Sequence, residues 1–376
     1  MISRFLLAAG LAVLMVISGF GSYLYLGTRQ SKLATPPQKP IAASPRAQAY
    51  VLPGTLYLAQ SGALYSLSAG RFHQLTPEDG WMQPYLYPDG SSLLAVKRSG
   101  YHSDVFSLSR FGAVQAQLTN NAAGPRSYDT ADNHWSFYPR LTPDMRTLFM
   151  SYDEPKYGFD VNMSVWSMPV GGNIRQARLW TYSNDYTGGD VEPIPLSNGA
   201  VLYTKYDYGD PPDNKLIAQL WITTRAGTYG RALTSINDDC LEPALSPNGR
   251  ELAMICTHEK QISHLVIAPF DGANIGPLQE VITDQLVAQP TWAPDGSGIA
   301  YLAPAEANGP FQLWFLRKDA YHPPVPTPMP SPTPTPGTHL ERSPRPVLYY
   351  PPVVVKPIQV TSFLGFDASS PLAWSN

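Results

Sequence analysis

Acidic side chains in the middle of the sequence are the residues best suited to hold a charged ligand. Glu192 and Glu242 each precede a proline in similar segments, Asp190 lies just before the first, and Asp238 and Asp239 lie just before the second. Carboxylates brought together in this way would suit calcium or a basic peptide, because both need oxygen ligands and negative charge. The alternative is that these carboxylates cap strand ends and accept hydrogen bonds from loop amides.

A second candidate metal site lies in the polar segment 126–135. Asp129, Asp132 and Asn133 offer oxygen ligands there, and His134 adds a nitrogen. The spacing lacks the glycine and the terminal glutamate of a calcium-binding loop. The sequence therefore indicates no cofactor, except for structural calcium at one of these two places.

Motifs of enzymatic catalysis do not occur in the sequence. It contains no Gly-x-Ser-x-Gly nucleophile elbow, no glycine-rich phosphate loop and no Cys-x-x-Cys pair. The segment that begins at His258-Glu259 departs from the zinc-helix pattern, because Ile262 stands where the second histidine must be. We therefore predict that the protein is not an enzyme.

The two cysteines, Cys240 and Cys256, lie on either side of the turn Pro247-Asn248-Gly249-Arg250. If the segments flanking this turn are antiparallel strands, the cysteines stand nearly opposite each other. A disulfide would then form in an oxidising compartment. The alternative is a pair of reduced, partly buried thiols.

The elements that would position these residues follow from an internal repeat. One unit recurs: a polar residue, a proline, a short apolar strand, a Pro-Asp-Gly turn or a relative of it, and a second apolar strand. A third strand with a bulky centre follows, and then a fourth that ends in a Leu-Thr-like signature. Such units of four antiparallel strands are typical of propeller blades. The copies begin at Gln83, Tyr138, Glu192, Glu242 and Gln289.

The two ends of the propeller region complete one more unit. Residues 54–76 contain the second, third and fourth strands of a blade without a first strand, and Ser370 to Ser375 form a first strand with nothing after it. Joined, these segments make a sixth blade that closes the ring. The sequence thus predicts an all-β, six-bladed β-propeller.

The segment Pro290-Thr291-Trp292-Ala293-Pro294-Asp295-Gly296, together with the Leu-Thr strand ends, resembles the repeat of the TolB-type six-bladed β-propellers, a WD-like family. The resemblance covers residues 54–376 and is weakest in the copies at Pro139 and Pro193. It implies an exported bacterial propeller. The protein that gives the family its name carries an additional N-terminal α/β domain, which an apolar segment and a linker replace here, so its partners are not carried over.

The residue before each blade proline is mostly polar, whereas the residue before that is mostly apolar. Alternation along a strand would point these two sets to different sides. Because the first strands of a propeller line its central channel, we predict that the polar set surrounds one mouth of the channel. The set comprises Gln83, Tyr138, Glu192, Glu242, Gln289 and Ser370.

Composition narrows the classes of partner. The chain has 26 Lys and Arg against 29 Asp and Glu, a net charge of −3, so no basic surplus is present to bind nucleic acid. Hydrophobic residues make up 43% of the chain, which excludes wholesale disorder. The 39 prolines and 29 glycines fit many short strands joined by turns.

Residues 1–31 are predicted to be a signal anchor. The uncharged run from Phe5 to Gly27 could cross a hydrocarbon core of about 30 Å as a helix, and a cleaved signal peptide is the alternative. Residues 32–53, rich in Pro and Ala, are predicted to form a linker. Residues 322–346 are predicted to be a disordered, Pro-rich insertion at the junction between the fifth blade and the terminal strands.

Together these features predict a non-catalytic, membrane-anchored bacterial propeller on the extracytoplasmic side, which binds another protein at the cell envelope. The first alternative is a sensor of a small ligand, a cation or a glycan at the mouth of the channel. The second is an accessory propeller of a hydrolase system. No nucleic acid is expected as a partner.

Overall fold

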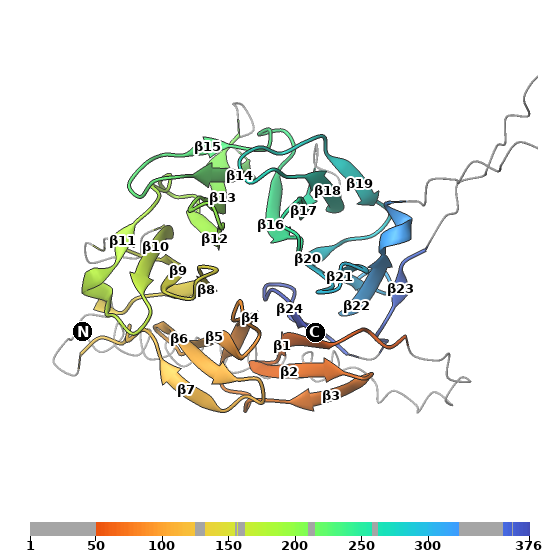
Figure 1. Ribbon diagram of the computed structural model, residues 1–376, viewed down its shortest axis with the longest axis horizontal. Helices are drawn as coiled ribbons and strands as arrows, with labels where there is room; N and C mark the ends of the chain where they lie inside the picture. Colours follow the sequence, from red (N-terminus) through yellow and green to blue (C-terminus); the bar gives the residue numbers. More distant parts are fainter. Residues whose placement is uncertain are drawn as a thin grey trace, which may run out of the picture. The chain divides into compact units, whose positions relative to one another are not determined.

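The computed structural model describes residues 50–124, 132–154, 156, 162–209, 215–257, 262–322, 356–362 and 364–376. In this part of the chain, strands β1 to β24 form six four-stranded antiparallel sheets. The sheets surround a common centre as propeller blades, with the first strand of each blade innermost (Figure 1). The prediction of an all-β, six-bladed propeller is confirmed.

Each blade runs outward from its first strand to its fourth. Blade one consists of β4 (Trp81–Leu86), β5 (Ser92–Arg98), β6 (Ser103–Ser109) and β7 (Val114–Gln117), and blade two of β8 (Ser136–Leu141), β9 (Thr147–Tyr152), β10 (Ser164–Pro169) and β11 (Arg178–Leu179). Blade three consists of β12 (Asp190–Pro195), β13 (Val201–Tyr208), β14 (Leu216–Thr223) and β15 (Arg231–Ala232), and blade four of β16 (Cys240–Leu245), β17 (Glu251–Cys256), β18 (His264–Pro269) and β19 (Gln279–Ile282). Blade five consists of β20 (Ala288–Trp292), β21 (Gly298–Pro304), β22 (Phe311–Arg317) and β23 (Ile358–Gln359). The 3₁₀ turns η2 (Ile174–Gln176) and η4 (Lys318–Ala320) lie between strands.

Blade six is built from both ends of the propeller, in the order β24 (Ala373–Ser375), β1 (Thr55–Gln60), β2 (Ala63–Ser68) and β3 (Arg71–Gln74). In the pairing of β24 with β1, Thr55 lies opposite Ser375 and Tyr57 opposite Ala373. The ring therefore closes through backbone hydrogen bonds between residues that are far apart in the sequence.

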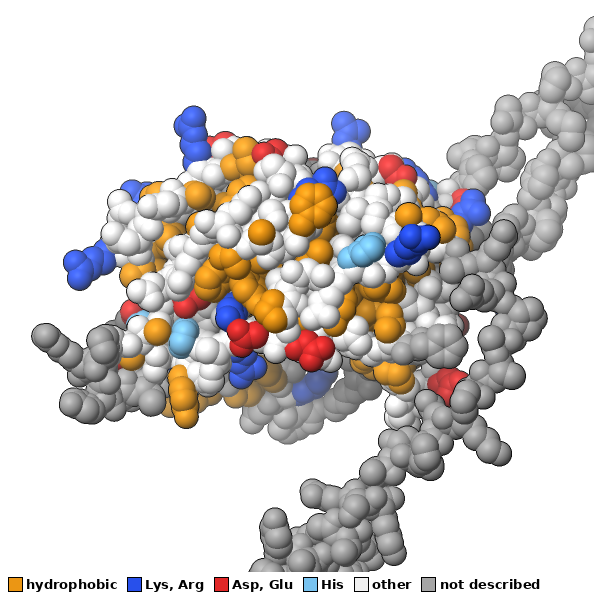
Figure 2. Space-filling view, turned by 90° about the horizontal axis from the view of Figure 1, so that it is seen from below, with side chains coloured by type: hydrophobic (Ala, Val, Ile, Leu, Met, Phe, Trp, Pro, Cys, Tyr) orange, Lys and Arg blue, Asp and Glu red, His pale blue; other side chains and the backbone are white. Residues whose placement is uncertain are grey.

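The core of the propeller is a series of apolar layers between neighbouring blades. The middle strands are buried on both faces, as in β5, where Leu93, Leu94, Ala95 and Val96 are fully buried. One layer joins blades five and six and includes Leu302, Phe315 and Trp374. On the side of the ring shown in Figure 2, acidic and basic side chains are interspersed among apolar and neutral ones.

The Leu-Thr signature at the end of the fourth strand has a structural role. In five blades the threonine hydroxyl accepts a hydrogen bond of 2.9 to 3.0 Å from an amide of the third strand, and so continues the sheet beyond the last backbone pair. These threonines are Thr76, Thr119, Thr181, Thr234 and Thr361.

The position predicted for the Pro-rich insertion is wrong in one respect. Because β23 pairs with β22, the insertion falls inside blade five, between its third and fourth strands, and not at the junction with blade six. Its residues 323–346, like the anchor segment Phe5 to Gly27 and most of the linker, lie outside the described residues. Among the residues that are described, no helix is long and apolar enough to span a membrane.

Candidate functional site

The centre of the propeller contains a cavity of about 450 Å³. The first strands of all six blades contribute to its wall, together with a proline at or just beyond the end of five of them: Pro88, Pro143, Pro195, Pro247 and Pro294. The cavity therefore lies at the end of the channel where the first strands finish. Its lining includes Arg140, Glu192 and Glu242 beside aromatic and apolar side chains.

A β-bulge in the first strand of blades one to five sets the direction of the predicted polar residues. In these strands the register shifts at the residue before the proline, and that residue has a positive φ between 51° and 57°. A left-handed conformation is costly for a residue with a Cβ, and such bulges re-aim a side chain. The bulge, rather than simple strand alternation, decides where these side chains point. The residues are Gln83, Tyr138, Glu192, Glu242 and Gln289.

Side chains of this set join one blade to the next. At four junctions, the side-chain oxygen of one blade accepts a hydrogen bond from the backbone amide at the equivalent position of the following blade. The bonds run from the amide of Tyr138 to Gln83 Oε1 (2.7 Å), of Glu242 to Glu192 Oε2 (3.0 Å), of Gln289 to Glu242 Oε2 (2.5 Å) and of Gln83 to Ser370 Oγ (2.8 Å). The equivalent residue of blade two is Tyr138. Its side chain has no amide or carboxylate oxygen close to the backbone that could accept such a bond from the next blade.

The two glutamates are held by hydrogen bonds, Glu192 in a buried position and Glu242 in a half-buried one. Only 9% of Glu192 is exposed, and its Oε2 also accepts a hydrogen bond from Thr204 Oγ1 at 2.8 Å. Glu242 Oε1 accepts a further bond from Gln289 Nε2 at 2.8 Å. Burial raises the pKa of Glu192 above its usual range. Burial, with the nearby charge of Glu192, raises the pKa of Glu242 to about 8. The pair therefore does not carry two full negative charges at neutral pH.

Arg140 is the basic member of the cavity wall. Its guanidinium lies over the ring of Tyr85, 4.1 Å from the centroid, in a cation–π arrangement. Burial lowers the pKa of Arg140, while Tyr85 and Glu192 oppose the shift. Tyr138, on the same strand, has its pKa raised well above the usual range, mainly by burial, so its phenol stays neutral. The wall thus combines one cation, two carboxyl groups with raised pKa values, and tyrosine rings.

The other acidic residues of the predicted sector have different surroundings. Asp190 is fully buried and pairs with Lys205 Nζ at 3.1 Å. Asp238 accepts a hydrogen bond from the Ser235 amide at 3.0 Å. Asp239 pairs with Lys215 at 2.8 Å and accepts a bond from the Ala218 amide at 2.8 Å. Of the predicted set, the structure brings Gln83, Tyr138, Glu192, Glu242 and Gln289 together around the channel.

The second predicted metal site falls partly outside the described residues, because Asp129 belongs to the segment 125–131. Asn133 Oδ1 accepts a hydrogen bond from the Ala123 amide at 2.7 Å, and the Asn133 carbonyl accepts one from Lys156 Nζ at 2.6 Å. In the described part of the chain, which includes Asp132, no group of three or more His, Cys, Asp or Glu side chains could hold a metal ion.

Cys240 and Cys256 lie directly opposite each other on β16 and β17, and their sulfur atoms are 2.08 Å apart. Both residues are buried in the layer between blades three and four. A disulfide here joins the first two strands of blade four just beside the bulge that positions Glu242.

The fold of the propeller is similar to that of solved structures. The TolB structure from Acinetobacter baumannii is 15% identical, over 71% of this chain and 62% of that chain, with a TM-score of 0.52. The chain has the fold of the TolB-type β-propeller. At this identity the likeness establishes the fold alone, and the chain spans less than two thirds of that TolB structure.

Further structures are similar to this TolB-type propeller at lower TM-scores. A putative TolB from Agrobacterium tumefaciens is 13% identical, over 71% of this chain and 85% of that chain, with a TM-score of 0.48. A gluconolactonase from Xanthomonas campestris is 12% identical, over 75% of this chain and 86% of that chain, with a TM-score of 0.45. No family model and no curated protein sequence matches the chain.

Arg140 is the residue of this site that sequence reasoning did not identify. The signal was present one position further along the same repeat. The residue after the blade proline is Tyr85, Arg140, Ile194, Ala244, Thr291 and Leu372 in the six copies, so the sole charge at this position is that of Arg140. The residues before the proline, which led to the predicted set, carry no positive charge in any copy and so gave no indication of Arg140.

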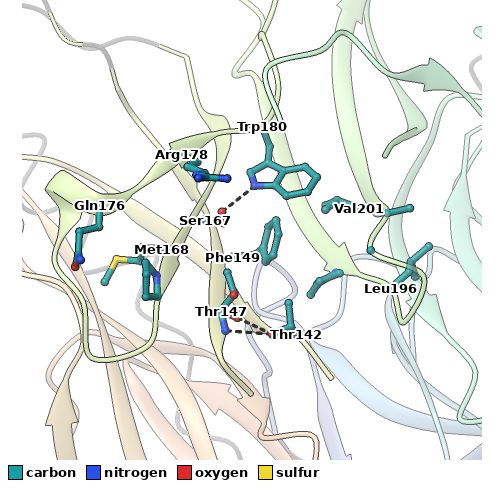
Figure 3. Close-up of a pocket in the computed structure, with 14 residues that line it drawn as sticks. Thr142, Thr147, Phe149, Ser167, Met168, Gln176, Arg178, Trp180, Leu196 and Val201 are labelled. Carbon is teal, nitrogen blue, oxygen red and sulfur yellow. Dashed lines mark hydrogen bonds between the residues drawn. The ribbon is translucent and has the colours of Figure 1, made fainter. Parts of the chain in front are cut away.

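A second cavity of about 470 Å³ lies between blades two and three (Figure 3). Phe149 and Trp180 form one side of it, and Leu196 and Val201 of blade three form the other. The Trp180 indole donates a hydrogen bond to Ser167 Oγ at 2.8 Å, so the ring is held in place (Figure 3). This groove is mostly apolar and contains no carboxylate.

Proposed function

We propose that this protein is a non-catalytic, membrane-anchored propeller on the extracytoplasmic side of a bacterial cell, where it binds a segment of another protein in the central cavity. The observation that carries the proposal is the cavity itself, with its volume of about 450 Å³ and its wall drawn from all six blades. Its lining mixes prolines, tyrosines and a few charged groups, which is the composition of sites that hold a ligand by apolar contact and orient it by polar contact.

The cavity can be tested as the contact site by photo-crosslinking. A photoreactive phenylalanine analogue in place of Tyr87, which lines the cavity, should crosslink one defined protein in intact cells. The same analogue in place of Phe111, which is 86% exposed on blade one, serves as the matched control and should give no crosslink to that protein.

Filling the cavity supplies the second arm of the test. Thr291 also lines the cavity and carries no charge, so Thr291→Trp should occupy part of its volume and abolish the crosslink from Tyr87. The melting temperature of the variant must stay close to that of the wild type for this loss to count. If no protein is captured from the Tyr87 position, or if Thr291→Trp leaves capture unchanged, the proposal is wrong.

A further inference from the structure

Arg140 has hydrogen-bonding capacity that the protein itself does not use. Among the described residues its guanidinium makes one hydrogen bond, from Nη1 to the neighbouring carbonyl of Pro139 at 3.3 Å. None of the ion pairs among the described residues includes Arg140, although the charge of Glu192 opposes the lowering of the Arg140 pKa. A guanidinium carries five N–H donors in a planar fork that matches a carboxylate. Most of these donors are therefore left for a ligand.

The carboxylates of the next two blades, Glu192 in blade three and Glu242 in blade four, are in the reverse situation. Both oxygens of Glu242 are bonded to Gln289, one through the backbone amide and one through the side-chain amide. Glu192 Oε2 holds Thr204 and the Glu242 amide. Three of the four carboxylate oxygens thus accept hydrogen bonds that link blades three, four and five. Most guanidinium donors of Arg140, in contrast, donate to no group of the described residues.

We infer that Arg140 is the anion-binding residue of the central cavity and that the bound segment presents a carboxylate to it. The inference rests on the proposed function and names the chemistry of the occupant. The stack on Tyr85 holds the plane of the guanidinium, so that the fork is oriented before the ligand arrives. The carboxylate could come from an acidic side chain or from a chain terminus, and both present the same planar group.

Four short peptides separate these sources and test the sign of the charge. The probes are acetyl-Gly-Gly-Asp-Gly-Gly-amide, its Asn and Lys analogues, and acetyl-pentaglycine with a free C-terminal carboxylate. Binding to the full chain in detergent is measured by calorimetry or by chemical-shift titration at millimolar peptide. We expect the Asp peptide, the free-carboxylate peptide or both to bind at least about tenfold more tightly than the Asn peptide. This factor corresponds to one charge-assisted hydrogen bond, which the Asn peptide cannot make.

Variants assign this selectivity to one residue. Arg140→Gln should abolish the preference for the carboxylate, and Arg140→Lys, which keeps the charge but not the planar fork, should restore it only in part. Arg146→Gln removes an exposed positive charge from the turn of the same blade and should change nothing. The inference would be overturned if neither the Asp peptide nor the free-carboxylate peptide bound more tightly than the Asn peptide, if the Lys peptide were preferred, if no peptide bound, or if the selectivity survived Arg140→Gln.

The test of Arg140 as the anion-binding residue and the test of protein binding in the cavity can fail independently of each other. If Arg140→Gln captures the protein partner from the Tyr87 position as well as the wild type does, the propeller binds a protein but the anion contact is wrong. If the peptides follow Arg140 but Tyr87 captures no protein, the anion site stands and the protein-binding role is wrong.

Discussion

Glu242 links two properties of the channel, because the same carboxyl group that holds the Gln289 amide also titrates near neutral pH. Its pKa is about 8 in the folded state, against an ordinary value near 4.5. The folded protein thus retains a proton that the unfolded chain has lost. The contribution of Glu242 to the free energy of unfolding should therefore fall as the pH rises from about 5 to about 8, by at most about 1.4 kcal/mol per pH unit.

Replacing the Glu242 carboxyl by an amide tests whether this residue has the raised pKa. Glu242→Gln cannot ionise, so denaturant unfolding of the variant across this pH range should show a smaller loss of stability than the wild type. Glu306→Gln, at an exposed position, is the matched control and should keep the wild-type slope. Identical slopes for all three proteins would show that Glu242 does not carry the raised pKa.

At the level of single residues, comparison of repeat copies located the channel side chains but did not explain their direction. The copies revealed Gln83, Glu192 and Glu242 because a repeat places equivalent residues in equivalent surroundings. The positive φ of these residues depends on strand register, which a single sequence does not display. The pairing of Asp190 with Lys205 was equally hidden, because it depends on which residues two strands place opposite each other.

At the level of strands, the turn motifs located the hairpins because Pro and Asp/Asn-Gly have few conformations open to them. Short outer strands were harder to find. β23 contains only Ile358 and Gln359, and the long insertion separates it from β22, so neither length nor spacing marked it as part of blade five. The composite blade was predictable because residues 54–76 lack the first strand of a blade and the segment from Ser370 to Ser375 supplies one.

Replacing Trp374 tests whether strand β24 closes the ring. It lies on β24, is 8% exposed, donates a hydrogen bond to the Pro53 carbonyl at 2.7 Å and contacts the Phe315 ring of blade five. Trp374→Ala should lower the free energy of unfolding by about 3–5 kcal/mol, because it removes a large buried side chain. Phe111→Ala, at an exposed position on blade one, should change it little. A Trp374→Ala variant with the same denaturant midpoint as the wild type would contradict closure through β24.

At the scale of the whole molecule, the propeller provides a rigid frame and the channel provides the site. Hydrogen bonds between equivalent positions tie blade to blade along the inner wall, while apolar layers fill the space between the blades. Close packing of these layers gives the wall a fixed geometry. Specificity can therefore reside in single substitutions such as Arg140, on a fold that many proteins share.

The proposed attachment of the propeller to a membrane rests on the segment from Phe5 to Gly27. If that segment is a retained anchor, the full chain should stay in the membrane fraction after washing with high salt and with carbonate, because about 20 apolar residues in a bilayer resist both treatments. A chain that starts at Tyr50, the first described residue, should remain in the soluble fraction and keep the melting temperature of the propeller. Recovery of a shortened chain in the soluble fraction, with a new N-terminus near Ser22, would instead identify a cleaved signal peptide and remove the anchor from the proposed function.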